Sequence, residues 1–130
     1  MPRILIIDDD YYVRIMFQYL FLDAGYEVKL ASNGQVALNC LSDFVPDLML
    51  IDISMPIMTG PEFIKNLNNL ASSRPELKGI PYIILTGENI SESEREFGFQ
   101  KDISCKFFLP KMTEHNSVLA LVKKVLNKTD

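Results

Sequence analysis

The sequence predicts an α/β fold in which a doubly wound, five-stranded parallel sheet carries helices on both faces. Short apolar runs alternate with longer segments of helical pattern, and this alternation is typical of a parallel sheet. The apolar runs are continuous, as expected for strands that are buried on both faces. The chain has 130 residues, of which 48% are hydrophobic and 23% charged, so it is large enough for one domain with a substantial core.

The first half of the chain supplies three of the expected strands. Residues 4–7 form the first strand, and a helix is expected over residues 11–24. Asp10 is placed to be the N-cap of this helix, and Gly25 stops its pattern. Apolar side chains occur all along the helix, so we expect it to be largely buried. The next elements are a strand over 26–31, a turn at 32–34, a short helix through Leu41 and a strand over 48–51.

The second half supplies two strands and three helices. Thr59 and Glu62 form a capping box, which predicts a helix from this point to about Ala71. Ser91 and Glu94 form a second capping box, which predicts a fourth helix. The other expected elements are a polar connector over 72–79, strands over 82–85 and 106–109, and a last helix opened by Thr113 and Glu114.

Composition excludes several classes of function. The 13 Lys and Arg residues against 17 Asp and Glu give a net charge of −4, and no basic run of five exists, so nucleic-acid binding is not expected. No apolar stretch approaches the roughly 18–20 residues that span a bilayer, and no signal peptide is visible, so we expect a cytoplasmic protein without membrane insertion. Cys40 and Cys105 are expected to be buried free thiols. With His115 as the one histidine, histidine-based metal sites and catalytic triads are nearly excluded.

Polar residues stand where the predicted strands end. Asp8 and Asp9 follow the first strand, Asp52 follows the third, and Thr86 and Lys111 follow the fourth and fifth. In open parallel sheets, ligands bind beyond the carboxyl ends of the strands. Carboxylates that share a site need a compensating positive charge, and oxygen ligands favour Mg²⁺ over zinc. A carboxylate, Mg²⁺, a hydroxyl and an ammonium together are suited to phosphoryl transfer onto the carboxylate.

These motifs resemble the receiver domain of two-component response regulators, over essentially all 130 residues. The resemblance is carried, in order, by Ile4-Leu5-Ile6-Ile7-Asp8-Asp9-Asp10, by Asp47-Leu48-Met49-Leu50-Ile51-Asp52 with Met55-Pro56 and Gly60, by Ile83-Ile84-Leu85-Thr86-Gly87, and by Phe108-Leu109-Pro110-Lys111. It implies one receiver domain over residues 1–130, similar to the single receivers of chemotaxis, with a flavodoxin-like fold and strand order 2-1-3-4-5. It also implies a sensor histidine kinase or a phosphotransfer protein as the partner, and signalling through the face of helix four, strand five and helix five.

The resemblance implies a role for each residue of the acidic site. Asp52 would be the phosphoacceptor, and Lys111 would contact the phosphoryl group. Mg²⁺ would be held by Asp8, Asp9 and Asp52, with Asp9 a direct ligand. The backbone carbonyl of Ser54 would complete the protein ligands.

Three further residues have implied roles beside this site. Thr86 would contact the phosphoryl group and act as a switch residue. Phe108 falls at the position of the switching aromatic, which turns inward when Thr86 moves; the alternative is a plain strand residue at the sheet edge. Ser54 and Glu88 flank the attacking water in this family, so they would tune the rate of self-dephosphorylation.

The sequence departs from the family's usual pattern after the fifth strand. Met112 follows Lys111 where a proline is usual, and Pro110 precedes it. We expect the Lys111–Met112 peptide to be trans, because a cis bond before a residue other than proline costs roughly 2.5–4 kcal/mol. Since Pro110 has no N–H, the fifth strand should end by Leu109 and lie at a sheet edge. Lys106 begins that strand at the opposite end of the sheet, so it should not be the site lysine.

Two other functions remain open from the sequence. A phosphate-independent pseudo-receiver would bind partners without accepting phosphate, although the intact acidic set argues against it. A phosphatase of the haloacid dehalogenase type could use Asp8 and Asp10 as its Asp-x-Asp pair. That class needs a further acidic pair beyond its lysine, and Glu114 and Asp130 are the only acidic residues that follow Lys111 in the sequence.

Capping of the next helix is the alternative role for Asp10. No pattern of a DNA-binding helix-turn-helix follows the fifth strand, and the sequence leaves open whether the receiver stands alone or belongs to a longer protein.

Overall fold

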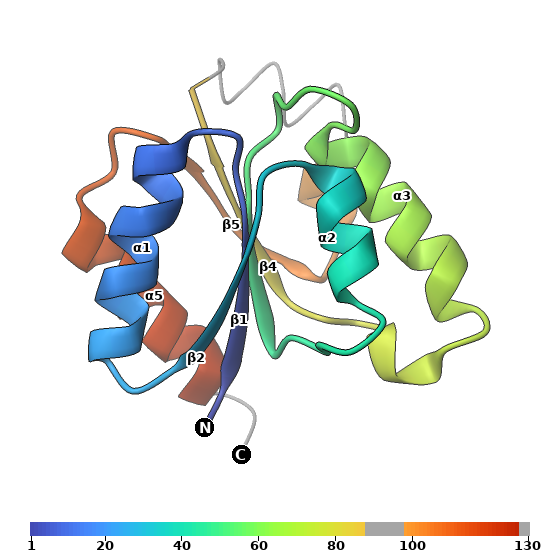
Figure 1. Cartoon of the computed structure of the whole chain (residues 1–130), viewed down its shortest axis with the longest axis horizontal. Coiled ribbons are helices and arrows are strands. Elements are labelled where there is room, and N and C mark those ends of the chain that lie inside the picture. The colour runs from blue at the N-terminus through green and yellow to red at the C-terminus, as the bar shows by residue number, and fades with distance from the viewer. Residues whose placement is uncertain (88–97, 128–130) are drawn as a thin grey trace.

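The computed structural model describes residues 1–87 and 98–127, and it contains the expected parallel sheet with helices on both faces (Figure 1). The strand order is β2-β1-β3-β4-β5, as expected. The strands are β1 Arg3–Ile7, β2 Glu27–Ala31, β3 Leu48–Ile51, β4 Tyr82–Thr86 and β5 Cys105–Pro110. The α-helices in these residues are α1 Tyr11–Asp23, α2 Gly34–Cys40, α3 Gly60–Ala71 and α5 His115–Asn127, with short 3₁₀ turns at Pro75–Leu77 and Phe99–Lys101. The described residues therefore contain four α-helices, and the expected helix opening at Ser91 lies outside them.

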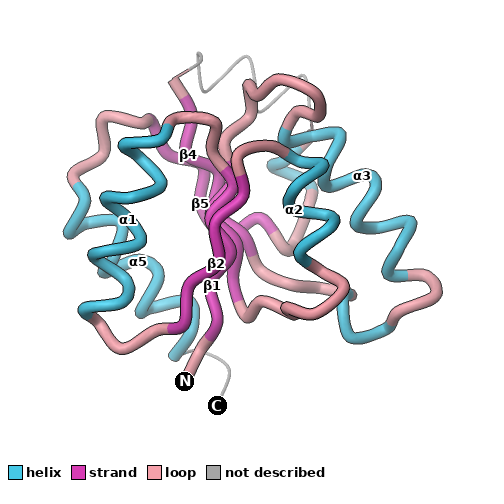
Figure 2. The backbone as a smooth tube through the Cα atoms, in the orientation of Figure 1, coloured by secondary structure: helices cyan, strands magenta, loops and turns pink. Residues whose placement is uncertain are grey.

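The sheet lies between two layers of helices (Figures 1 and 2), and it separates two hydrophobic cores. Helices α1 and α5 cover one face, where they pack against Ile4 and Ile6 of β1. Helices α2 and α3 cover the other face, where they pack against Leu5 and Ile7. Successive residues of β1 thus point into opposite cores, as the period of two in a strand requires. This burial on both sides explains why the central strands are continuous apolar runs.

Helix α1 begins and ends as predicted but is less buried than expected. The Asp10 carboxylate accepts a hydrogen bond from the Tyr12 amide at 2.9 Å, and Gly25 lies just beyond the helix with a φ of 93°. The expectation of a largely buried helix is wrong, because Phe17 and Phe21 are its fully buried residues. Its outward face exposes Tyr11, Tyr12, Ile15, Tyr19 and Leu22. Apolar residues occupy both faces of α1, so the sequence pattern does not distinguish the buried face from the exposed one.

The starts of α2 and α3 follow from their capping residues. The capping box of α3 is confirmed: the Thr59 hydroxyl accepts from the Glu62 amide at 3.3 Å, and the Glu62 carboxylate accepts from the Thr59 amide at 2.9 Å. The hydrogen bond from the Thr59 amide lowers the pKa of Glu62. At α2, the side chain of Asn33 accepts a hydrogen bond from the Val36 amide at 3.0 Å. Asn33, in the middle of the expected turn at 32–34, is therefore the N-cap of that helix.

Strand β5 lies at a sheet edge, as predicted, and the Lys111–Met112 peptide is trans. The prediction that β5 ends by Leu109 is wrong by one residue, because the strand includes Pro110. The Lys111 amide donates to the Thr86 carbonyl at 2.8 Å, so Lys111 faces β4. Since residues alternate along a strand, Pro110 faces the open edge, where its missing N–H removes no ladder bond.

Cys40 and Cys105 are free thiols, as expected, but they are half-buried and not fully buried. Cys40 is the last residue of α2, and burial is the main cause that raises the pKa of its thiol. Cys105 begins the edge strand β5. Over the described ranges, no helix combines the length and apolar character that crossing a membrane would require.

Candidate functional site

Three carboxylates meet at the carboxyl ends of the central strands. Asp8 follows β1 and Asp52 follows β3, and these strands are neighbours with Ile7 paired to Ile51. The Asp52 amide donates to the Ile7 carbonyl at 2.9 Å, which fixes the two strand ends side by side. Oxygen atoms from Asp8, Asp9 and Asp52 all lie within 4.8 Å of one another. Asp8 and Asp52 are only 3% and 4% exposed, while Asp9 is exposed, so the cluster forms a buried pocket with one carboxylate at its mouth.

Lys111 brings a positive charge into this cluster from β5. Its Nζ atom lies 3.2 Å from Oδ1 of Asp8 and 3.3 Å from Oδ2 of Asp52, so it donates to both carboxylates. The trans peptide after Lys111 therefore still lets its ammonium reach Asp52. Lys106 instead donates to the Ile103 carbonyl at 2.9 Å, at the other end of the strand. The structure thus brings Lys111 to the carboxylates and leaves Lys106 outside the site.

The electrostatics of the pocket leave it short of positive charge. Burial is the main cause that raises the pKa of Asp52 to about 7, and the charge of Asp8 raises it further against the effect of Lys111. Burial also raises the pKa of Asp8. Burial opposes the charged form of Lys111, but the carboxylates outweigh it and raise the pKa of Lys111. One ammonium does not balance three carboxylates, so the donor set fits a hard divalent cation such as Mg²⁺.

The turn between β1 and α1 shapes the pocket, and Arg14 of α1, which was not predicted from the sequence, donates to it. The Asp10 amide donates to Oδ1 of Asp8 at 2.9 Å, while the Asp10 side chain caps α1 and so is committed to the helix. Arg14 donates to the backbone carbonyl of Asp8 at 2.7 Å. The sequence does contain a signal for Arg14, because it is the single charged residue in the first three turns of this helix.

The loop after Asp52 approaches it closely at a glycine. A Cβ atom on Gly60 would lie 2.5 Å from the carbonyl oxygen of Asp52, so only glycine fits there without a backbone shift. Earlier in this loop, Ile57 has a φ of 69°, and the Met58 amide donates to the Pro56 carbonyl at 2.7 Å. This is a three-residue turn of the rare, strained kind. No sequence signal predicted it, because a β-branched residue is among the least suited to positive φ.

Three other predicted site residues lie in β4, in β5 and in the loop after Asp52. Thr86 ends β4 and is 1% exposed. Phe108 is half-buried in β5 and pairs with Ile84 of β4, so it lies on the same face of the sheet as Thr86. Ser54 is exposed in the loop after Asp52. Glu88, predicted to tune the lifetime of a phosphoryl group, lies outside the described residues.

Comparisons with known proteins agree on one family. A family model described as the response regulator receiver domain matches residues 4–127. The response regulator MprA of Mycolicibacterium vanbaalenii is 32% identical over 127 residues, which is 98% of this chain and 51% of that protein. The chain therefore spans about half the length of the curated relatives it matches.

Solved structures show the same similarity. The chemotaxis protein CheY4 of Vibrio cholerae has a TM-score of 0.80 at 30% identity, with 96% of this chain and 98% of that chain covered. The response regulator TrrA of Thermotoga maritima, solved in complex with Mg²⁺ and BeF, has a TM-score of 0.71 at 26% identity, with 96% and 99% covered.

Proposed function

The chain belongs to the response regulator receiver domain family, and from this membership we propose that it accepts a phosphoryl group on Asp52. The observation that carries the proposal is the position of Lys111, which donates to both Asp8 and Asp52 inside a cluster of three carboxylates. The proposed receiver domain comprises residues 1–130. The donor would be a phosphohistidine on a sensor histidine kinase or on a phosphotransfer protein.

In the proposed reaction, an Asp52 oxygen attacks the phosphorus atom of the donor. A new O–P bond forms, the N–P bond to histidine breaks, and the imidazole leaves with its electron pair. The ammonium of Lys111 lies 3.3 Å from Oδ2 of Asp52. It could therefore donate a hydrogen bond to an oxygen of a phosphoryl group bound there. The hydroxyl of Thr86 would donate to a second phosphoryl oxygen. The Asp52 pKa of about 7 means that the attacking carboxylate needs positive charge nearby at neutral pH.

The residues present fit Mg²⁺ as the cofactor. Asp8, Asp9 and Asp52 would hold it with their carboxylates, and Ser54 with its backbone carbonyl. When bound, Mg²⁺ would neutralise charge on the phosphoryl oxygens and on the acidic cluster. The complex of TrrA with Mg²⁺ and BeF supports this choice, because that protein has the same fold.

The signal would leave through the face formed by β5, α5 and the helix that the sequence predicts from Ser91. A phosphoryl group on Asp52 would draw Thr86 inward, and Phe108 would turn into the space that Thr86 leaves. Moving such an equilibrium from a few per cent to mostly active needs about 3–4 kcal/mol. A few charge-assisted hydrogen bonds can supply this energy.

Two residues would tune how long the phosphoryl group lasts. Ser54 and Glu88 stand at positions that flank the attacking water in this family. We expect Ser54→Ala and Glu88→Ala to change the rate of dephosphorylation without abolishing phosphorylation. Unchanged decay in both variants would remove these two residues from the mechanism.

The experiment that tests the proposal is labelling with acetyl phosphate and Mg²⁺, followed by intact-protein mass measurement. Wild type should gain one phosphoryl group, and Asp52→Asn should gain none. The matched control is Asp10→Asn, which should still be labelled because the Asp10 side chain caps α1. No labelling and no beryllofluoride binding in wild type would favour a phosphate-independent binding module. Multiple turnover of a phosphate ester would favour a phosphatase, although the commitment of Asp10 to helix capping argues against that class.

A further inference from the structure

We propose that Arg14 is a positioning residue for the metal site: it holds the backbone carbonyl of Asp8 and so fixes the peptide group that leads into Asp9. The inference deepens the proposed function, because it rests on Asp9 being a ligand of Mg²⁺. It assigns to a side chain of α1 a part in assembling the acidic pocket, without contact with the cation or with the phosphoryl group.

The place of Arg14 in α1 directs its side chain toward the acidic pocket. Asp10 is the N-cap of α1, and the Arg14 amide donates to the Asp10 carbonyl at 3.1 Å, so Arg14 lies one helical turn beyond the cap. Side chains of a helix lean toward its N-terminus. The guanidinium therefore extends back past the cap, and its Nη1 atom donates to the Asp8 carbonyl at 2.7 Å. Cζ of Arg14 lies 5.8 Å from the centroid of the Tyr11 ring, which flanks the guanidinium.

The two carboxylates of this turn are held in different ways. The Asp8 carboxylate accepts from the Asp10 amide at 2.9 Å and from Lys111 at 3.2 Å. The Asp9 carboxylate, in contrast, makes no hydrogen bond and no ion pair within residues 1–87 and 98–127. Its place within 4.8 Å of the other two carboxylates therefore depends on its backbone. That backbone begins with the peptide group whose carbonyl Arg14 holds.

Arg14 acts through geometry, and its charge would have the opposite effect. In the part of the chain that the structure describes, its guanidinium forms no ion pair with a carboxylate, and its hydrogen bond goes to a neutral carbonyl. A positive charge near a cation site repels the cation. A ligand that is already held in place loses less conformational freedom when the cation binds. Removal of Arg14 would therefore tighten Mg²⁺ binding if only its charge mattered, and weaken it if Arg14 positions Asp9.

The size of the effect follows from the kind of contact. Residues that orient metal ligands without touching the metal typically contribute about 10–100-fold to metal affinity. Arg14 acts on one of three carboxylates and only through the backbone, so the lower end of this range applies. Arg14→Met keeps the length of the side chain and removes the donor, and it should weaken Mg²⁺ binding about ten-fold. Arg14→Lys keeps a donor on a stem of similar length, so it should lose less affinity than the methionine variant.

The test titrates Mg²⁺ into the whole chain and measures the dissociation constant from the shifts of amide signals in NMR spectra. Wild type, Arg14→Met and Arg14→Lys are compared. Arg14→Ala is a second variant without the donor, and it should weaken binding as the methionine variant does. Alanine is the best helix former, so this variant guards against a poor fit of methionine. Urea unfolding in EDTA checks that each variant is folded.

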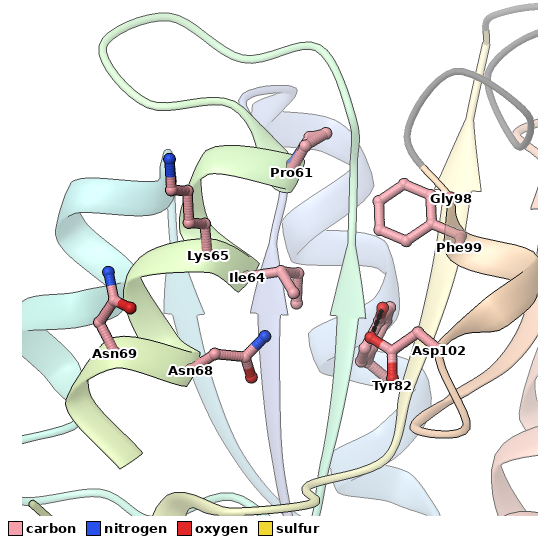
Figure 3. A pocket seen from close by; sticks show the side chains of 9 residues that line it. All are labelled: Pro61, Ile64, Lys65, Asn68, Asn69, Tyr82, Gly98, Phe99 and Asp102. Atoms are coloured by element: carbon pink, nitrogen blue, oxygen red, sulfur yellow. Dashed lines mark hydrogen bonds between the residues drawn. The ribbon is translucent and has the colours of Figure 1, made fainter. Parts of the chain in front are cut away.

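Two control variants separate this effect from loss of stability and from loss of charge. Arg74 is half-buried like Arg14, and its Nη1 atom donates to the Leu41 carbonyl at 2.8 Å, at the end of α2 away from the acidic pocket (Figure 1). Arg74→Met thus removes the same kind of hydrogen bond elsewhere. Lys65→Met removes one positive charge from α3, where Lys65 lies beside the groove shown in Figure 3. Both controls should leave the Mg²⁺ affinity unchanged.

Each outcome bears on one or both proposals. Unchanged or tighter Mg²⁺ binding by Arg14→Met and Arg14→Ala would overturn this inference while leaving the proposed function intact. An equal loss of affinity in Arg74→Met would also overturn it, because the effect would then follow from general stability. A lysine variant as weak as the methionine variant would show that the donated hydrogen bond is not the cause. Failure of wild type to bind Mg²⁺ would overturn this inference and the proposed function together.

Discussion

Replacing Asp52 with asparagine should make the chain more stable at neutral and alkaline pH. The side chain is 4% exposed, close to the Asp8 carboxylate, and shares one ammonium with it. Asparagine keeps the shape of the side chain and an oxygen that accepts from Lys111, but it removes a buried negative charge. The variant therefore relieves like-charge repulsion and desolvation without opening a cavity.

The size and sign of the effect follow from the pKa of Asp52, which rises from 3.8 to about 7 on folding. A raised pKa means that the folded chain holds its proton where the unfolded chain has already lost it. The contribution of Asp52 to wild-type stability therefore falls as pH rises from about 4 to about 7, with a slope near 1.4 kcal/mol per pH unit, and is level above that. A rise of about three units in the pKa of Asp52 corresponds to a loss of about 4 kcal/mol of stability. Relaxation of the pocket around the charged carboxylate makes this loss smaller. We expect Asp52→Asn to be about 2–4 kcal/mol more stable than wild type at pH 8.

Urea unfolding in EDTA at pH 4, 5, 6, 7 and 8 measures this difference directly. The free-energy gap between Asp52→Asn and wild type should grow with pH up to about 7 and then stay constant. Asp23→Asn, at the exposed end of α1, is the matched control and should not change the slope. A gap that is the same at pH 4 and pH 8, or an asparagine variant that is less stable at pH 8, would refute this account of the pocket.

Three further predictions test other parts of the structure. Gly60→Ala should lower the unfolding free energy by about 1–3 kcal/mol and weaken beryllofluoride binding, because its Cβ would lie 2.5 Å from the Asp52 carbonyl oxygen. Urea unfolding measures the stability and NMR titration measures the binding; a variant with unchanged stability and affinity would contradict the close approach. Added Mg²⁺ should raise the urea midpoint of wild type and have little effect on Asp9→Asn, and an equal rise in both would exclude Asp9 as a ligand. Tyr82→Phe should lower the unfolding free energy by about 1–3 kcal/mol, because the Asp102 carboxylate loses a 2.6 Å hydrogen bond. No change in urea unfolding would mean that the hydrogen bond between Tyr82 and Asp102 contributes little.

Most of the fold could be predicted because its signals are local. The continuous apolar runs of β1 and β3 and the capping box at Thr59 each occupy a few adjacent residues, and the structure confirms them. The burial of α1 was predicted wrongly because Tyr12 and Tyr19 are apolar by composition yet point outward. Which face of such a helix packs is decided by the position of the sheet, which the helix sequence does not contain.

The acidic site was likewise predictable from residues at strand ends, but its details were not. Asp8 and Asp52 are brought together by the pairing of β1 with β3, so the topology alone implies their proximity. The hydrogen bond between Tyr82 and Asp102 joins residues 20 positions apart in the sequence. The φ of 69° at Ile57 contradicts the usual preference of that residue type. Both features depend on tertiary contacts that override local preference.

The orientation of Pro110 has a consequence for how the sheet meets other chains. An edge strand presents unpaired N–H and C=O groups, which can template the addition of a foreign strand. Because Pro110 faces outward from β5, the ladder of donors on that edge is interrupted one residue before Lys111. A strand from a neighbouring molecule could not continue its pairing past this point toward the acidic pocket. Pro110 therefore opposes edge-to-edge aggregation at the end of β5 that lies nearest the acidic site.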